Sequence, residues 1–484
     1  LWIIPLGIYL LSFVLTFRDR PLYPAWITSK FHLVAGFSLL LYFFAQGKIL
    51  PMLPQLAAFL LSLFALCLFC QHELYQSRPQ DKNDLTAFYL MLSLGGFTGS
   101  LLLTWLAPLV LTSPLEFLFG LFLVGLSLSL RQDHFRITFD HMRFIAYTVI
   151  LIIAWPLVFK KFSLFGIILI LLMVGLIFRE LNKRKSALGL CLLSVLIAAP
   201  FAESFWSKDG NVIRTYRNYY GIYKISAMHG VVALINGNTM HGAQYLTDHS
   251  TKRAEPLTYY HRKTLAGKVL GDGQVRTHRV GIVGLGVGTL SIYGKKGDEM
   301  DFFELDPDIA SFVNLFDYLQ MSGATLRFFF EDARMALRKM PPNYYDVLII
   351  DAFSGDSVPV HLLTTDAILE YKSRLKDQGF ILFHISNRYL DLSPVLFTNA
   401  GAVGAFARLD RNAAEGPMLF ASTWMALTWN RQIHETLGFR KHGKENAAGL
   451  KVARPWTDQY SNIPSVLRLN LIADSVKTFP AFSW

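Results

Sequence analysis

The chain has 484 residues, of which 52% are hydrophobic, and its formal net charge is +11. Most of this positive excess lies in short segments between the apolar runs of residues 1–202, so it indicates membrane topology and argues against a nucleic-acid partner. No cysteine follows Cys191, which excludes a disulfide framework in residues 203–484.

Eight apolar runs divide the first part of the chain. A membrane-spanning helix needs about 20 residues, with roughly 17 as the lower limit, and the runs reach or approach this length. We therefore predict a multi-span α-helical membrane domain of about eight spans over residues 1–202, in contact with membrane lipids. The runs cover residues 1–17, 31–45, 49–70, 85–111, 115–130, 144–159, 162–178 and 187–202.

Lysine and arginine are unevenly distributed among the predicted loops. With eight spans, loops 18–30, 71–84, 131–143 and 179–186 share one side of the membrane and hold most of the basic residues of this half. The positive-inside rule assigns that side to the cytoplasm, which would leave the rest of the chain outside. A cytosolic substrate would not reach an enzyme there, so the side of the soluble part stays open.

Residues 203–255 are predicted to form a small antiparallel β lead-in domain. Within it, residues 211–246 alternate between apolar and polar side chains as strands do, and Asn236-Gly237 suits a hairpin turn. Residues 256–270 are predicted to be helical. They open the last predicted domain, residues 256–484, which we expect to be an α/β domain of the Rossmann-like type.

A glycine-rich turn is the strongest motif of this last domain. It follows a short apolar run that reads as a buried strand, and its glycines are Gly284, Gly286 and Gly288. Glycine lets the backbone approach a ligand at a place where a Cβ atom would clash. In dinucleotide-binding folds the third glycine lies three residues after the second, so the tighter spacing here favours another ligand class.

Carboxylates follow the next predicted strands. Glu304 ends the second strand, where it can accept two hydrogen bonds from a ribose diol, and a helical segment is expected between the glycines and this strand. Asp332 follows the third strand, residues 324–330, where it can accept an adenine amine or cap a helix. Asp351 follows the fourth strand, residues 345–350. Ligands bind such sheets at the carboxyl ends of the strands, so these groups are expected to converge there.

These motifs resemble those of a broad enzyme class and of one family within that class. The glycine spacing is similar to the first motif of class I S-adenosylmethionine-binding enzymes. Residues 212 to about 465 resemble spermidine synthase-like proteins, the polyamine aminopropyltransferases. The matching stretches include NGNTMHGAQ, PLTYYH, GLGVGT, FFELDPDI, EDAR and YDVLIIDAFSGDSVPVHLLT. The first half, with HELYQSRP and LTAFYLMLSLGGFTGSLL, is similar to the multi-pass region fused to such domains in bacterial inner-membrane proteins.

The resemblance implies roles for individual residues. Glu304 would hold the ribose hydroxyls, and Asp332 with Ala333 would bind the adenine. Asp351 would be the catalytic aspartate that helps to deprotonate an attacking amine. The amine would displace the aminopropyl group from decarboxylated S-adenosylmethionine, with no metal involved. The amine substrate itself would lie against Tyr259 or Tyr260, with Asp356 as a further carboxylate.

The chain also departs from the family pattern. Asp356 lies five residues after Asp351, whereas soluble spermidine synthases have their second carboxylate three residues after the first. His261, Arg262 and Lys263 stand where those enzymes place an acidic or amide residue, and two cations there would weaken polyamine binding. The nucleoside site therefore looks preserved, while the acceptor site looks altered.

Three functions remain open on the sequence. The first is a membrane-anchored aminopropyltransferase, and the second is a methyltransferase that uses S-adenosylmethionine at the same glycines, Glu304 and Asp332. The third is a non-catalytic subunit of a membrane complex that keeps the fold as a binding module. Protein partners in a membrane complex and homo-oligomerisation are likewise left open.

Overall fold

The computed structural model describes most of the chain. It covers residues 3–130 except 25, 28–29 and 47–51, five residues between 146 and 197, residues 211–437 except 238, 274, 276, 353–358 and 388, and residues 454–468. The chain divides into two compact units, one of Leu1–Lys208 with Phe482–Trp484 and one of Asp209–Ala481. Each unit is considered by itself below.

Helices make up most of the described residues between 3 and 130 of the first unit. Its helices lie on the first five predicted apolar runs, because such runs satisfy their backbone hydrogen bonds internally while exposing apolar side chains. Their packed centre includes Phe31 and Phe69, whose stacked rings lie 3.8 Å apart. The elements are α1 (Ile3–Thr16), α3 (Phe31–Gln46), α4 (Met52–Gln76), α5 (Lys82–Leu101), the π-helix η1 (Leu102–Leu106), α6 (Ala107–Val110) and α7 (Glu116–Leu130).

Two of these helical stretches have the length and apolar composition of a membrane span. They are Pro54–Gln76 and Lys82–Val110, while three further apolar helices are shorter. The second stretch exposes large apolar side chains, among them Leu90, Phe97 and Trp105. The three predicted runs at 144–159, 162–178 and 187–202 lie outside the described residues apart from isolated positions, as does the predicted boundary at 202.

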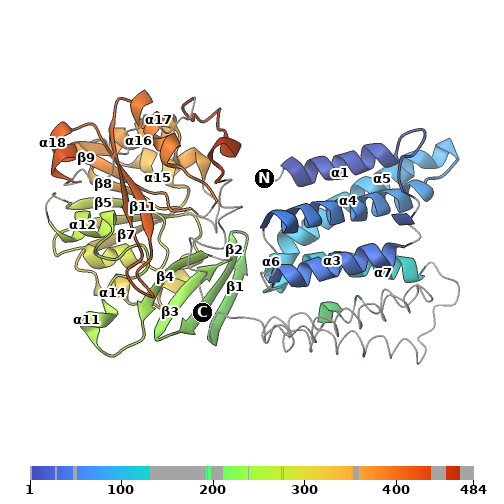
Figure 1. The fold of residues 1–484 in the computed structure, drawn as a ribbon, viewed down its shortest axis with the longest axis horizontal. Coiled ribbons are helices and arrows are strands. Elements are labelled where there is room, and N and C mark those ends of the chain that lie inside the picture. Colours follow the sequence, from blue (N-terminus) through green and yellow to red (C-terminus); the bar gives the residue numbers. More distant parts are fainter. Residues whose placement is uncertain are drawn as a thin grey trace. The chain divides into compact units, whose positions relative to one another are not determined.

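The second unit begins with a four-stranded antiparallel sheet of order β1-β2-β3-β4. Asn236 and Thr239 pair across the turn between β3 and β4, and Asn218 and Gly221 pair across the turn between β1 and β2. Figure 1 shows this sheet in green. Its strands are β1 (Asn211–Asn218), β2 (Gly221–Met228), β3 (Val231–Asn236) and β4 (Thr239–Tyr245), followed by the single turn α11 (Ser250–Arg253).

A seven-stranded mixed sheet forms the centre of this unit. Its order is β10-β11-β9-β8-β5-β6-β7, in which β9, β8, β5, β6 and β7 run parallel and the two strands at the β10 end run antiparallel. The strands are β5 (Arg279–Val283), β6 (Glu299–Glu304), β7 (Thr325–Phe330), β8 (Tyr345–Ile350), β9 (Leu375–His384), β10 (Phe406–Asn412) and β11 (Ser422–Thr428). The unit is therefore a Rossmann-like α/β domain built on a mixed sheet, as the sequence predicted.

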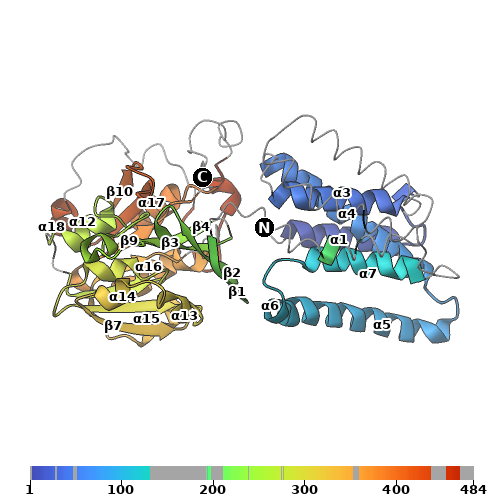
Figure 2. The same ribbon diagram turned by 90° about the horizontal axis from the view of Figure 1, so that it is seen from below.

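Two apolar cores lie on the two faces of this sheet (Figures 1 and 2). One joins Ile282, Phe302 and Ile349 to helix α12 and to the antiparallel sheet. The other joins Phe303, Leu348 and Phe383 to α15, α16 and α17. The helices are α12 (Leu265–Gly271), α13 (Ile309–Val313), α14 (Tyr318–Met321), α15 (Ala333–Lys339), α16 (Thr365–Arg374), α17 (Ser393–Ala402) and α18 (Arg431–Thr436), with 3-10 turns η2 (Thr289–Tyr293), η3 (Val360–Leu362) and η5 (Ile463–Val466).

Two predicted helices are shorter than the sequence suggested. Residues 256–264 are not helical, and α12 begins only at Leu265, where Thr264 caps it by accepting from the Gly267 N–H group. The segment after the glycine turn is the single 3-10 element η2. The segment after Pro307 is broken into α13 and α14, because Asn314 to Asp317 turn between them.

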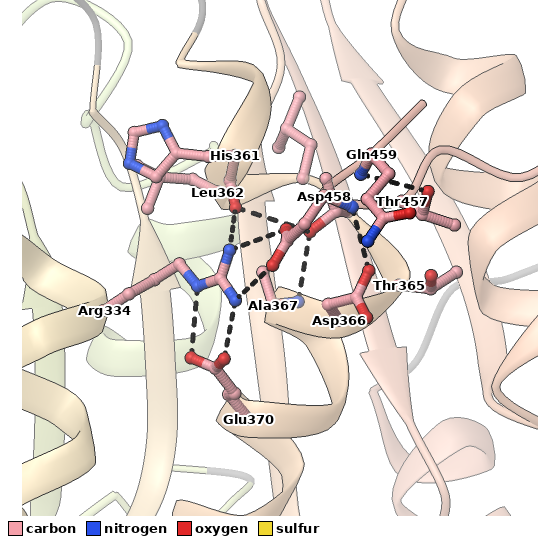
Figure 3. Close-up of polar contacts among 12 residues, drawn as sticks. Arg334, His361, Leu362, Thr365, Asp366, Ala367, Glu370, Thr457, Asp458 and Gln459 are labelled. Carbon is pink, nitrogen blue, oxygen red and sulfur yellow. Dashed lines mark hydrogen bonds and ion pairs between the residues drawn. The ribbon is translucent and has the colours of Figure 1, made fainter. Parts of the chain in front are cut away.

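Arg334 anchors the described C-terminal segment, residues 454–468, to helices α15 and α16 (Figure 3). Its guanidinium donates to both carboxylate oxygens of Glu370, at 3.1 and 2.6 Å, and to both of Asp458, at 2.8 and 3.0 Å. It also donates to the His361 carbonyl. Arg334 is buried, so two bidentate carboxylate partners and a carbonyl compensate for the loss of its hydration.

Candidate functional site

The glycine turn leaves β5 at the centre of the parallel strands. Gly284 has a φ of +100°, and a Cβ atom there would lie 2.3 Å from the Asp351 carbonyl oxygen. Gly286 has a φ of +54°, and its Cβ would lie 2.8 Å from the His241 carbonyl. The sequence predicted glycines for close approach of a ligand. The structure shows in addition that carbonyl groups of the protein itself lie against both glycines. A side chain at Gly284 would displace Asp351, and one at Gly286 would displace β4.

Gly288 closes the turn and starts η2. Its φ is +77°, and a Cβ atom there would lie 2.6 Å from the Leu319 side chain. All three predicted glycines therefore lie in one turn between β5 and η2, at the carboxyl end of β5.

Glu304, the last residue of β6, lies beside this turn. Its Oε2 accepts a hydrogen bond of 2.9 Å from the Leu285 N–H group, and its Oε1 accepts one of 3.0 Å from the Asp306 N–H group. Burial raises the pKa of Glu304, although these backbone donors act in the opposite direction. The carboxylate therefore fixes the glycine turn. Each of its oxygens has a second lone pair that a ribose hydroxyl could use.

Asp332 and Ala333 lie at the junction of β7 and α15. Asp332 Oδ1 caps the helix by accepting from the Met335 N–H group at 3.1 Å, and its Oδ2 lies 3.3 Å from His361 Nε2. Asp332 thus caps a helix, which is one of the two roles that the sequence analysis considered for it. Ala333, the first residue of α15, is buried in the apolar core that this helix shares with the sheet. The adenine-binding role of the pair stays a prediction.

Asp351 follows β8 and is linked to two aromatic side chains. Its Oδ2 accepts a short hydrogen bond from the Tyr260 hydroxyl, and its Oδ1 lies 2.7 Å from His384 Nδ1. The side chains of His384 and Asp351 are only 3% and 5% exposed. Since β8 and β9 are parallel neighbours with Ile350 opposite Phe383, the next residue of each strand meets at the same edge. Both oxygens of the predicted catalytic carboxylate are therefore engaged.

His384 lies between two aromatic rings. Trp424, its partner across the β9–β11 pair, stacks on it with ring centroids 4.6 Å apart, and Tyr259 lies 4.7 Å away on centroids. The Tyr259 hydroxyl donates to the Met240 carbonyl at 2.7 Å. Burial, with the charge of Asp351 as the next cause, raises the pKa of Tyr259 and of Tyr260, so both hydroxyls stay protonated. The two predicted acceptor tyrosines thus have different contacts. The Tyr260 hydroxyl donates to Asp351, and the Tyr259 ring lies against the His384 ring.

The two basic residues after His261 form ion pairs with nearby carboxylates, and their predicted effect on polyamine binding stays a prediction. Arg262 lies 3.4 Å from Glu255, and Lys263 is paired with Glu415, so both cations are balanced at the surface. His261 is buried next to the Phe420 carbonyl, and burial lowers its pKa. Asp356, the second predicted acceptor carboxylate, lies outside the described residues.

His384 and Ser386 are the site residues that sequence reasoning passed over. His384 ends β9 and Ser386 follows two residues later, and the sequence analysis assigned neither of them a role. The available signal was their position, since they stand at the same carboxyl edge as the other candidates. What the sequence did not contain was the strand order that makes β9 the neighbour of β8.

Comparisons with known proteins give similarity over part of the chain. A polyamine aminopropyltransferase of Vibrio vulnificus (strain CMCP6) is 31% identical over 130 residues, which are 25% of this chain and 42% of that protein. The similarity is to spermidine synthase-like proteins. The chain thus spans less than half of the length of that curated relative, and no family model matches it.

Solved structures of similar fold carry names from the same group and from methyltransferases. A probable spermidine synthase of Corynebacterium glutamicum is 16% identical, covers 51% of this chain and 97% of its own, and has a TM-score of 0.37. The spermidine synthase of Thermotoga maritima is 14% identical, with coverage of 55% and 87% and a TM-score of 0.34. Human methyltransferase-like protein 13 is 17% identical, with coverage of 42% and 98% and a TM-score of 0.28.

The described residues hold no cluster of three or more His, Cys, Asp or Glu side chains arranged to bind a metal ion. The groups that converge at the sheet edge are a glycine turn, three carboxylates, a histidine and two tyrosines. These groups suit an uncharged nucleoside body next to a centre where a proton is removed.

Proposed function

We propose that residues 209–481 form an aminopropyltransferase of the spermidine synthase type. Its donor substrate would be decarboxylated S-adenosylmethionine, and its acceptor would be a small amine. One observation carries the proposal: the glycine turn after β5 and Asp351 after β8 touch, with the Asp351 carbonyl 2.3 Å from where a Gly284 Cβ would be. A nucleoside held by the turn would have its sulfonium end beside Asp351.

The proposed reaction requires few chemical steps from the protein itself. The sulfonium already makes the adjacent carbon electrophilic, so the site has to hold the nucleoside and present a neutral amine. Glu304 would hold the ribose and Asp332 the adenine, as the resemblance implies. The 31% identity to a polyamine aminopropyltransferase supports this choice of group transferred.

We also propose that the first unit anchors this domain in a bacterial inner membrane as a multi-pass domain. Two described helices are long and apolar enough to cross a bilayer. The apolar side chains that α5 and η1 expose, such as Phe97 and Trp105, are compatible with lipid as their surroundings.

Calorimetry and a transfer assay on the full chain in detergent test the proposal. We expect methylthioadenosine to bind, because the product thioether uses the same ribose and adenine contacts as the donor. We expect the transfer of an aminopropyl group from decarboxylated S-adenosylmethionine to an amine such as putrescine. Glu304→Ala should weaken nucleoside binding, and a folded protein that gives no heat at millimolar methylthioadenosine would rule out the nucleoside site.

Two other outcomes would assign a different function. Methyl transfer from S-adenosylmethionine, without aminopropyl transfer, would make the protein a methyltransferase that uses the same turn. Binding of methylthioadenosine without transfer to any polyamine would instead point to a non-catalytic module of a membrane complex.

A further inference from the structure

A hydrogen-bonded chain of four side chains runs through the candidate site. It begins with the Tyr260 hydroxyl on Asp351 Oδ2 and continues from Asp351 Oδ1 to His384 Nδ1 over 2.7 Å. It ends at Ser386, whose Oγ lies 2.7 Å from His384 Nε2. The Thr423 N–H group donates to the same Oγ at 2.8 Å. The three contacts given with distances have the length of a formed hydrogen bond.

The partners determine where the protons lie. The carboxylate of Asp351 only accepts, so the proton of the neutral imidazole lies on Nδ1. Nε2 is then the basic nitrogen. Ser386 accepts from Thr423 and has one hydrogen left to donate, which it gives to Nε2. The stacked rings of Trp424 and Tyr259 hold the imidazole in this orientation.

The geometry points to His384, and not Asp351, as the group that receives the proton of the acceptor amine, with Ser386 as the intermediate that passes it on. Both Asp351 oxygens are held by protein partners, Tyr260 and His384, and the Asp351 side chain is only 5% exposed, so an amine would reach this chain of side chains from its other end. Ser386 is the more exposed end of the chain, whereas His384 is buried. Asp351 is thereby a positioning residue: it fixes the tautomer and stabilises the imidazolium, as the aspartate does in a Ser-His-Asp triad.

This inference rests on the proposed function, and its steps balance as follows. The acceptor ammonium gives one proton to Ser386 Oγ as the serine hydrogen moves to Nε2, which leaves a neutral amine and an imidazolium. The amine lone pair forms the new N–C bond. The C–S bond breaks with its electron pair on sulfur, which converts the sulfonium to a neutral thioether and the amine to a secondary ammonium.

Three variants of the full chain test this relay. His384→Gln keeps a polar side chain that cannot take the proton, Ser386→Ala removes the intermediate, and Asp351→Asn removes the charge that stabilises the imidazolium. His278→Gln is the matched control, since His278 is also paired with an aspartate, Asp298, but precedes β5 at the opposite edge of the sheet. The described titratable groups facing His384 are Asp351, Tyr259 and Tyr260.

We expect His384→Gln to lower kcat by about 10²- to 10⁴-fold, the range of a general base, and to remove the decline of kcat at acidic pH. Ser386→Ala should give a smaller loss, and His278→Gln none. Methylthioadenosine affinity should change little in all of them. A His384→Gln protein that keeps the wild-type kcat and pH profile would overturn the relay.

Nitrogen NMR of the His384 ring supplies a readout that does not need turnover. We expect protonated Nδ1 and unprotonated Nε2 in the neutral ring, and a weaker preference for this tautomer in Asp351→Asn. The opposite tautomer in the wild type would overturn the relay even in an active enzyme. If the wild-type protein shows the expected tautomer and binds methylthioadenosine but transfers nothing, aminopropyl transfer fails, and His384 as its proton acceptor fails with it, while the hydrogen-bonded chain stands.

Discussion

At the scale of single residues, the site depends on backbone positions that only glycine can occupy. Gly284 combines a φ of +100° with a distance of 2.3 Å from its hypothetical Cβ to the Asp351 carbonyl. The positive φ disfavours any L residue, and the close carbonyl adds a clash that backbone movement alone can relieve. The two effects can be separated, because Gly297 has a similar φ of +94° with no atom near its Cβ position.

We therefore expect Gly284→Ala to lose far more than Gly297→Ala. The Gly297 variant should be destabilised by about 1–2 kcal/mol, the cost of a left-handed conformation for an L residue, and should bind methylthioadenosine as the wild type does. The Gly284 variant should be less stable than that and should lose nucleoside binding, because its Cβ displaces Asp351. Thermal unfolding and calorimetry on both proteins measure this. Equal effects would mean that the contact with Asp351 is unimportant.

At the scale of elements, the buried guanidinium of Arg334 and its two partly exposed carboxylate partners join the C-terminal segment to the α15–α16 pair (Figure 3). Hydrogen bonds from Arg334 lower the pKa of Asp458. Burial alone would raise the pKa of Glu370, but the hydrogen bonds from Arg334 and Arg338 outweigh it and lower that pKa. Removing one carboxylate partner therefore weakens the attachment of residues 454–468 without disturbing the sheet.

Both folded pKa values lie below the unfolded values of about 3.9 for Asp and 4.3 for Glu. The unfolded chain thus binds more protons as the pH falls, so this stabilisation is present above those values and is lost through the lower, folded pKa values. We expect the protection factors for hydrogen exchange in residues 454–468, which compare the observed rate with the intrinsic rate at the same pH, to fall as the pH falls below about 4. Asp458→Asn should weaken that pH dependence. Glu435→Gln, which breaks an exposed pair with Arg431, should leave it intact.

At the scale of the whole molecule, the proposed activity and the charge distribution make different demands. An aminopropyltransferase needs its donor and its amine in the cytoplasm. With eight spans, the basic loops place residues 203–484 on the other side. An odd number of spans would place the basic loops and residues 203–484 together in the cytoplasm. The last three predicted spans lie within residues 131–210, so the number of spans in that segment decides the question.

We expect the C-terminus to be cytoplasmic. A phosphatase reporter fused after Trp484 should be inactive, while a fluorescent reporter that folds only in the cytoplasm should be active. The protein should stay with membranes in alkaline carbonate and be released by detergent, because lipid-exposed helices need an apolar solvent. An active phosphatase fusion would place the domain outside and would favour a non-catalytic membrane module.

The sequence alone predicted the α/β class of the second unit and the sheet edge at which its candidate site residues lie. Gly284, Glu304, Asp332 and Asp351 each follow an apolar run, and the carboxyl ends of parallel strands meet at one edge of a sheet. An apolar run followed by a glycine or a carboxylate can be recognised in the sequence without knowledge of the tertiary structure. Local signals were weaker for helices, since residues 256–264 and the segment after Gly288 were expected to be helical and are not.

Only the tertiary structure decided what surrounds Asp351. His384 is 33 residues away along the chain and Tyr260 is 91 residues away, and no local pattern links either of them to the carboxylate. Strand order brings β9 beside β8, and the fold of residues 256–264 brings Tyr260 onto Oδ2. The physical reason is that hydrogen-bond partners depend on which elements become neighbours, and that is decided by the burial of both faces of the sheet.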